Sequence, residues 1–164
     1  MSFLRRLLGR PSARDPGDVY AALRSQVLTL APEAVGPMPE GQDVCVAVMD
    51  WNLGQGIATL VAVVDGTVSL YVSSGGGVIG AGQRERPRRA ADAFLAAAHL
   101  HRGVLQPATE LPLPAPGHVS FHIRTLHGNL TATATTDAVR DASHPLAPLF
   151  ATGQDLLTAL RELG

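Results

Sequence analysis

The chain has 164 residues, of which 46% are apolar and 16% are charged, and its formal net charge is −1. This length fits one domain that buries a sizeable core, and the near-neutral charge argues against a nucleic-acid partner. No apolar run approaches the roughly 18 residues of a membrane span, so the sequence does not favour a membrane protein.

The basic residues indicate a coding bias, whereas the single cysteine and the N-terminal residues indicate the compartment. All 13 positions counted as Lys or Arg are arginine, which together with abundant Ala, Gly and Pro is a bacterial-like composition biased toward G and C codons. The single cysteine, Cys45, cannot form an internal disulfide and fits a reducing environment. Leu7 and Leu8 are followed at once by Gly9, so the apolar core of a signal peptide is missing. We expect a cytoplasmic protein.

The first part of the chain is predicted to be a short basic segment followed by a helix. Residues 1–14 are interpreted as an amphipathic stretch and linker whose apolar side chains share one helical face: Phe3, Leu4, Leu7 and Leu8. A single domain is expected over residues 15–164. Its first helix is capped by Asp15, has Pro16 at its first position and ends at Pro32.

Five strands are predicted, at Val44–Met49, Ile57–Val64, Thr67–Ser73, His118–Leu126 and Leu130–Thr136. The first two are continuously apolar, as in strands buried on both faces. Asp65-Gly66 joins the second strand to the third and is a strong hairpin signal. In the fourth strand, apolar side chains alternate with Ser120, His122 and Arg124, which predicts a half-buried strand with its polar face exposed.

Helices are predicted between and after these strands. One begins at Pro87 and runs to about Leu105, and the last spans about Gln154–Leu163, with an irregular stretch or short helix around Leu146–Phe150 before it. Proline-rich connections occupy 32–42 and 106–117. This order, α-βββ-α-ββ-α, favours an α+β fold with one antiparallel sheet of about five strands and helices packed on it.

The glycine-rich run between Ser73 and Gly82 is the segment that this architecture does not explain. It matches G-x-G-x-x-G formally, but it follows a hairpin strand, and no acidic residue ends a strand about 20 positions later, so a dinucleotide site is not favoured. An anion-binding nest of backbone amides stays open. Its candidate residues are Ser73, Ser74, Gly75, Gly76, Gly77 and Gly80, with Arg84 and Arg86 downstream. The alternatives are close packing of small residues or a loop that orders on a partner.

No catalytic, cofactor or metal motif is recognised. His118 and His122 share a strand face, but four residues separate their α-carbons by about 13 Å, too far for one zinc ion. A G-x-S-x-G nucleophile elbow is absent. Asp50 and Trp51 form the most plausible polar corner, although turn and core roles account for both.

The order of elements resembles that of the class I type III secretion chaperones. The resemblance covers most of the chain, from the helix at Asp18–Leu30 to the helix at Gln154–Leu163, and it lies in the layout. It implies a small homodimer that binds a segment of another protein. A second similar layout is that of the roadblock-like dimeric scaffolds, which place their middle helix after two strands.

Two hypotheses for function follow. The leading one is a non-enzymatic protein-interaction module, chaperone-like or scaffold-like and homodimeric. Its candidate partner contacts are Phe3, Leu4, Leu7, Leu8, His122 and Arg124. The alternative is a binder of a phosphate- or carboxylate-bearing small molecule at the glycine-rich run.

Overall fold

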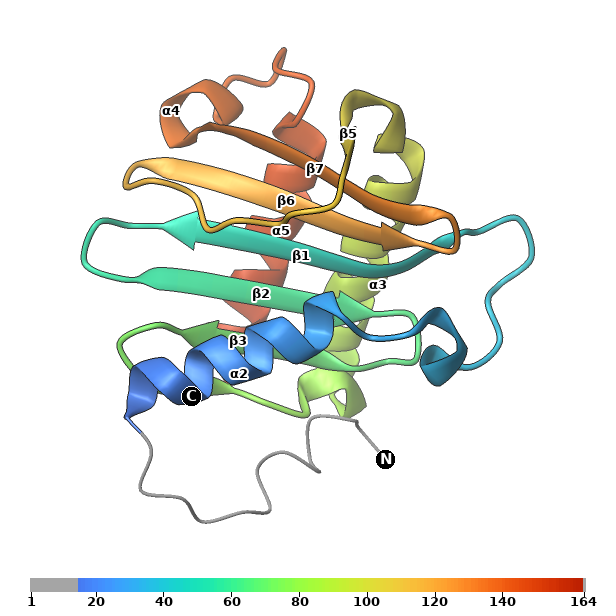
Figure 1. The fold of residues 1–164 in the computed structure, drawn as a ribbon, viewed down its shortest axis with the longest axis horizontal. Coiled ribbons are helices and arrows are strands. Elements are labelled where there is room, and N and C mark those ends of the chain that lie inside the picture. The colour runs from blue at the N-terminus through green and yellow to red at the C-terminus, as the bar shows by residue number, and fades with distance from the viewer. Residues whose placement is uncertain (1–14, 164) are drawn as a thin grey trace.

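The computed structural model describes residues 15–163, which form one antiparallel sheet covered by helices (Figure 1). The sheet order is β4-β3-β2-β1-β6-β7-β5, and every neighbouring pair is antiparallel. The strands are β1 Val44–Asn52, β2 Ile57–Val63, β3 Val68–Val72, β4 Gly77–Val78, β5 Gln106–Ala108, β6 His118–Thr125 and β7 Gly128–Thr135.

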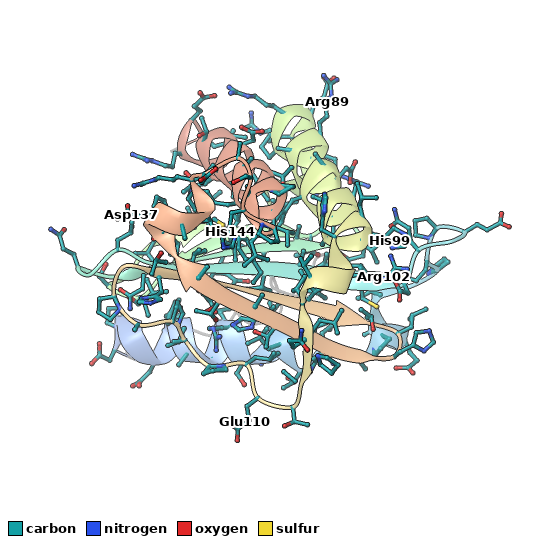
Figure 2. The ribbon with its side chains drawn as sticks, turned by 90° about the horizontal axis from the view of Figure 1, so that it is seen from above. Arg89, His99, Arg102, Glu110, Asp137 and His144 are labelled. Atoms are coloured by element: carbon teal, nitrogen blue, oxygen red, sulfur yellow. The ribbon has the colours of Figure 1, made fainter. Side chains whose placement is uncertain are left out.

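The helices lie in two layers on opposite faces of the sheet. They are α2 Pro16–Leu28, α3 Glu85–Leu100, α4 Thr136–Val139 and α5 Ala147–Arg161. Helix α2 crosses one face, whereas α3 and α5 pack together on the other (Figures 1 and 2). Asp15 accepts a hydrogen bond from the Gly17 N–H, and Pro16 occupies the first turn, so α2 begins where its capping residues predict.

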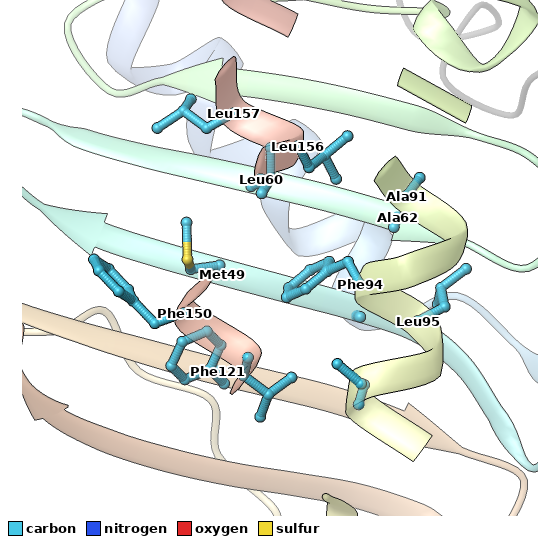
Figure 3. Packing of buried hydrophobic residues seen from close by; sticks show 14 of the residues in the cluster. Met49, Leu60, Ala62, Ala91, Phe94, Leu95, Phe121, Phe150, Leu156 and Leu157 are labelled. Carbon is cyan, nitrogen blue, oxygen red and sulfur yellow. The ribbon is translucent and has the colours of Figure 1, made fainter. Parts of the chain in front are cut away.

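Each face of the sheet has its own apolar core. On the α3–α5 side, Phe94 and Leu156 pack over strand residues such as Met49 and Phe121 (Figure 3). On the α2 side, Tyr20, Leu23 and Val27 pack over the apolar faces of β1, β2 and β3. Strand β1 is therefore buried on both faces, as its continuous apolar sequence predicts.

The α+β class and the single antiparallel sheet are confirmed, but the expectation of about five strands is wrong. The sheet of the described residues has seven. The two additional strands, β4 and β5, have two and three residues and lie at the two edges. Strand β4 falls inside the glycine-rich run, and β5 falls inside the second proline-rich connection.

The predicted helix order also needs correction. The short helix expected at Leu146–Phe150 and the last helix are one element, α5, and α4 follows β7 directly. Strand β1 continues to Asn52, so Asp50 and Trp51 belong to a strand and not to a turn. The basic segment 1–14 lies outside the described residues.

Candidate functional site

The α2 side of β6 and β7 carries polar side chains that pair across the two strands. Three consecutive cross-strand pairs are hydrogen-bonded: Ser120 with Thr133 at 2.7 Å, His122 Nδ1 with Thr131 Oγ1 at 2.9 Å, and Arg124 Nε with Asn129 Oδ1 at 3.0 Å. We call these six residues the polar ladder. Its alternation follows from the strand period of two, as the sequence of this strand predicts.

The prediction that this polar face is exposed is wrong for two of its residues. Ser120 is 1% exposed and His122 is 0% exposed, whereas Arg124 is half-buried. His122 is therefore not accessible to a partner in this structure. Arg124 remains accessible, and its role as a partner contact stays a prediction.

The cover over this face is the extended, proline-rich segment 109–116 between β5 and β6, which we call the strap. It crosses on the same side of the sheet as α2, and Figure 2 shows its residue Glu110 on that side. Three side chains beneath it bond to strap carbonyls. Arg24 donates to Leu111 O at 2.8 Å, His122 Nε2 lies 3.2 Å from Pro112 O, and Asn52 donates to Pro114 O at 2.9 Å.

Asp50 is the centre of a buried polar cluster that joins α2, the sheet and the strap. Its carboxylate is 0% exposed. Oδ2 accepts from Arg24 Nη2 at 2.6 Å and Nε at 3.1 Å, and it lies 3.2 Å from His122 Nε2. Oδ1 accepts from the Thr59 hydroxyl at 2.6 Å, which in turn bonds to the Tyr20 hydroxyl at 2.6 Å.

These contacts keep the Asp50 carboxylate ionised. Burial alone would raise the pKa of Asp50, but hydrogen bonds from His122, Arg24 and Thr59, with the charge of Arg24, outweigh burial and lower it. Burial raises the pKa of the neighbouring Tyr20 hydroxyl, which stays neutral. The cluster is thus a fully bonded buried ion pair, which ties α2 and the strap to the sheet.

The chain of groups Asp50–His122–Thr131 has the order of an acid, a base and a hydroxyl. Both Asp50 and His122 are 0% exposed beneath the strap, so a substrate does not reach them in this structure. The arrangement therefore supports an anchoring role for the cluster.

An open groove lies between α2 and the strap, with a volume of about 760 Å³. Its lining from α2 extends from Gly17 to Thr29, which at 1.5 Å per residue is a length of ~18 Å. Apolar and polar side chains share its walls. The residues lining it are Gly17, Tyr20, Ala21, Arg24, Ser25, Leu28, Thr29, Ile57, Ser73, Thr109, Leu111, Leu113, Arg124 and Asn129.

Close packing explains two glycines of the glycine-rich run. A Cβ on Gly77 would lie 2.1 Å from Leu70 O, and one on Gly82 would lie 1.7 Å from Gly66 O, so neither position accepts a side chain without movement of the main chain. The Ser73 hydroxyl accepts a hydrogen bond from the Ile57 N–H at 2.8 Å. Ser74 and Gly80 are part of the same loop around β4.

The structure does not bring the predicted anion ligands together. Gly75, Gly76 and Gly77 line an apolar cavity of about 400 Å³ next to α2, and no arginine lines it. Arg84 and Arg86 are exposed on the other side of the loop, where Arg86 pairs with Glu162 at the end of α5.

The sequence does not reveal the roles of Asp50 and Arg24 in the cluster. The prediction that Asp50 lies in a turn is wrong, because β1 continues to Asn52, and no sequence signal distinguishes Arg24 from the other arginines. The signal for Asp50 is a carboxylate directly after an apolar strand run, and a buried carboxylate requires a cationic partner. Nothing local in the sequence identifies that partner, because Arg24 lies 26 residues away.

Among residues 15–163, no group of three or more His, Cys, Asp or Glu side chains is arranged to hold a metal ion. No helix in that part of the chain is long and apolar enough to cross a membrane. Comparison of the chain with protein-family models, with curated proteins and with solved structures finds no match.

Proposed function

We propose that the protein is an interaction module that binds an extended segment of a partner protein in the groove between α2 and the strap. The observation that supports this proposal is the groove itself, open along ~18 Å of α2. At about 3.3 Å per residue, that length accommodates five or six residues of extended chain.

The walls of the groove match what a peptide needs. Leu113 is 44% exposed and, with the half-buried Leu111, offers apolar surface for peptide side chains, whereas Leu28 lines the groove but belongs to the core. Ser25 and Thr29 line the same groove. The Thr29 hydroxyl donates to Ser25 O at 2.8 Å and can still accept from a peptide N–H.

The strap itself has free hydrogen-bonding capacity. Its carbonyls at Leu111, Pro112 and Pro114 bond inward to side chains, whereas the N–H groups of Leu111 and Leu113 have no hydrogen-bond partner among the described residues. An extended segment lying beside the strap can accept from these N–H groups, which is the chemistry of strand addition.

The alternative, a small anion bound at the glycine-rich run, has less support, because the cavity there is apolar and lacks Arg84 and Arg86. The homodimer stays a prediction.

The experiment blocks the groove without touching the core. Ala21 is exposed on α2 and lines the groove, so Ala21→Trp fills it, whereas Gln26→Trp places the same ring on α2 outside the groove. A phage-displayed library of random decapeptides is selected on the wild-type protein, and enriched peptides are measured by fluorescence polarisation. We expect Ala21→Trp to weaken binding at least ~10-fold and Gln26→Trp to leave it unchanged. Equal binding by both variants, or no enrichment, contradicts the proposal.

A further inference from the structure

Arg124 differs from the other arginine of the groove in having no carboxylate partner. Arg24 is neutralised by Asp50 at 2.6 Å. Arg124 instead donates through Nε to Asn129 and through Nη1 to Leu30 O, both neutral acceptors. Among the described residues, no Asp or Glu forms an ion pair with it.

Among the residues that the structure describes, the charged ones lining the groove are Arg24 and Arg124, and the first is balanced by Asp50 below it. The charge of Arg124 is therefore the one that the described part of the groove leaves uncompensated. Burial lowers the pKa of Arg124, which reflects the cost of desolvating its charge. A carboxylate that reached the guanidinium would offset this cost through charge-assisted hydrogen bonds.

The geometry leaves donors available for such a group. A guanidinium has five N–H donors, and the bonds to Asn129 and Leu30 use two of them. Leu30 O lies just after the C-terminal end of α2, where the helix dipole repels anions. A carboxylate is therefore expected to approach from the other side, past Asn129 and Thr109, at the end of the groove where the strap begins.

We propose that the partner segment carries a carboxylate that docks on Arg124, with its apolar residues lying along α2 toward Gly17. This inference rests on the proposed function, because it specifies the occupant of the same groove. On this inference the protein binds segments that are apolar apart from one acidic group, and the position of that group sets the orientation of the segment in the groove. The acid is either a side chain or a chain terminus.

The test uses positional-scanning mixtures of synthetic hexapeptides in which one position is fixed as Asp, Asn or Lys. Each mixture is made with a free or an amidated C-terminus, which separates a side-chain acid from a terminal one. Binding is measured by fluorescence polarisation to the wild-type protein and to Arg124→Gln, Arg124→Lys and Ala21→Trp. Circular dichroism verifies that each variant is folded.

We expect the acid-bearing mixtures to bind the wild type about 10-fold more tightly than their neutral counterparts at one position or at the free terminus. Arg124→Gln should remove that preference, and Arg124→Lys should keep part of it, since a lysine retains the charge but not the planar fork. If Arg124→Gln does not fold, the test is the preference for an acid in the wild type and in Arg124→Lys. The inference requires that this preference be weaker in Arg124→Lys and be lost at high salt.

The outcomes separate the two proposals. If Ala21→Trp abolishes binding, the groove is the binding site. The inference about Arg124 is then overturned if the peptides show no preference for an acid, or if folded Arg124→Gln keeps that preference. Binding that Ala21→Trp does not affect overturns both.

Discussion

Removing the guanidinium of Arg24 tests whether the buried cluster holds the α2 layer on the sheet. Arg24→Met keeps the length and apolar stem of the side chain but leaves Asp50, which is 0% exposed, without its cation. Breaking one side of a buried ion pair typically costs 3–5 kcal/mol. Arg24 is 13% exposed, and Thr59 and His122 still bond to Asp50, so we expect the lower end, about 3 kcal/mol. For a domain of this size this is a fall in Tm of ~6–12 °C.

The assay is urea unfolding at pH 7, followed by the fluorescence of Trp51, the only tryptophan, which packs edge-on against Phe150 at 5.8 Å between ring centroids. Arg88→Met is the matched control. The Arg88–Asp92 ion pair is long, at 3.7 Å, and at least half exposed, so its loss should change the free energy of unfolding by less than ~0.5 kcal/mol.

A double-mutant cycle separates the pair from the packing. Asp50→Asn alone should also destabilise the fold, and the double variant Arg24→Met/Asp50→Asn should lose less than the two single losses combined, with a coupling of at least ~1 kcal/mol. If Arg24→Met costs less than ~1 kcal/mol, or if the two changes add without coupling, the cluster does not join α2 to the sheet as argued.

Three further predictions concern Asp50, Tyr71 and Gly77. The pKa of Asp50 is lowered in the fold, so its contribution to stability is present above the unfolded pKa of about 3.9 and is lost as the pH falls through the folded pKa. The advantage of wild type over Asp50→Asn in urea unfolding should therefore shrink between pH 7 and pH 3. A difference in free energy of unfolding that stays constant over this range would contradict the argument. The Tyr71 hydroxyl is buried without a hydrogen-bond partner among the described residues, and this burial raises its pKa. Tyr71→Phe should therefore be at least as stable as wild type at pH 7 and increasingly more stable above pH ~10, as measured by urea unfolding. Gly77→Ala should lower the free energy of unfolding by ~2–4 kcal/mol, since its Cβ would lie 2.1 Å from Leu70 O. The control Gly76→Ala has no atom within 4 Å of its Cβ and should lower it by only ~1 kcal/mol, because of its φ of +82°. Equal shifts in Tm for the two variants would show that contact with Leu70 O is not the reason for a glycine at position 77.

Much of the fold could be predicted because its signals are local. The capping of α2 by Asp15 and Pro16, the Asp65-Gly66 hairpin and the alternation along His118–Thr125 each depend on a few neighbouring residues. The structure contains all three features. Their local origin is the reason that a single sequence is enough to find them.

The edge strands could not be predicted in this way. Strand β4 has two residues and β5 has three, too few to show an alternation of two. Each exists because a neighbouring strand presents free N–H and C=O groups, β3 to Gly77–Val78 and β7 to Gln106–Ala108. A pairing of this kind depends on the position of a distant strand and not on the residues that join it.

Only part of the candidate site could be predicted, for a similar reason. The sequence predicts the polar face of β6, but the same alternation of polar and apolar residues occurs in a strand that faces water and in one that faces a polar cover. Here the strap supplies carbonyls to Arg24, His122 and Asn52, so buried donors are satisfied without water. Proline at 112 and 114 has no N–H to bury, which suits a segment that binds through its carbonyls.

The two walls of the groove are held by one side chain. Arg24 extends from α2, pairs with Asp50 on the sheet and donates to Leu111 O on the strap, so it fixes the distance between helix and strap. A guanidinium suits this position because its planar fork can bond in several directions at once, which an ammonium does less well. Arg124, in contrast, bonds to neutral acceptors alone within residues 15–163. The two arginines therefore differ: Arg24, neutralised by Asp50, holds the two walls of the groove together, whereas the role proposed for Arg124 is to select the segment that binds there.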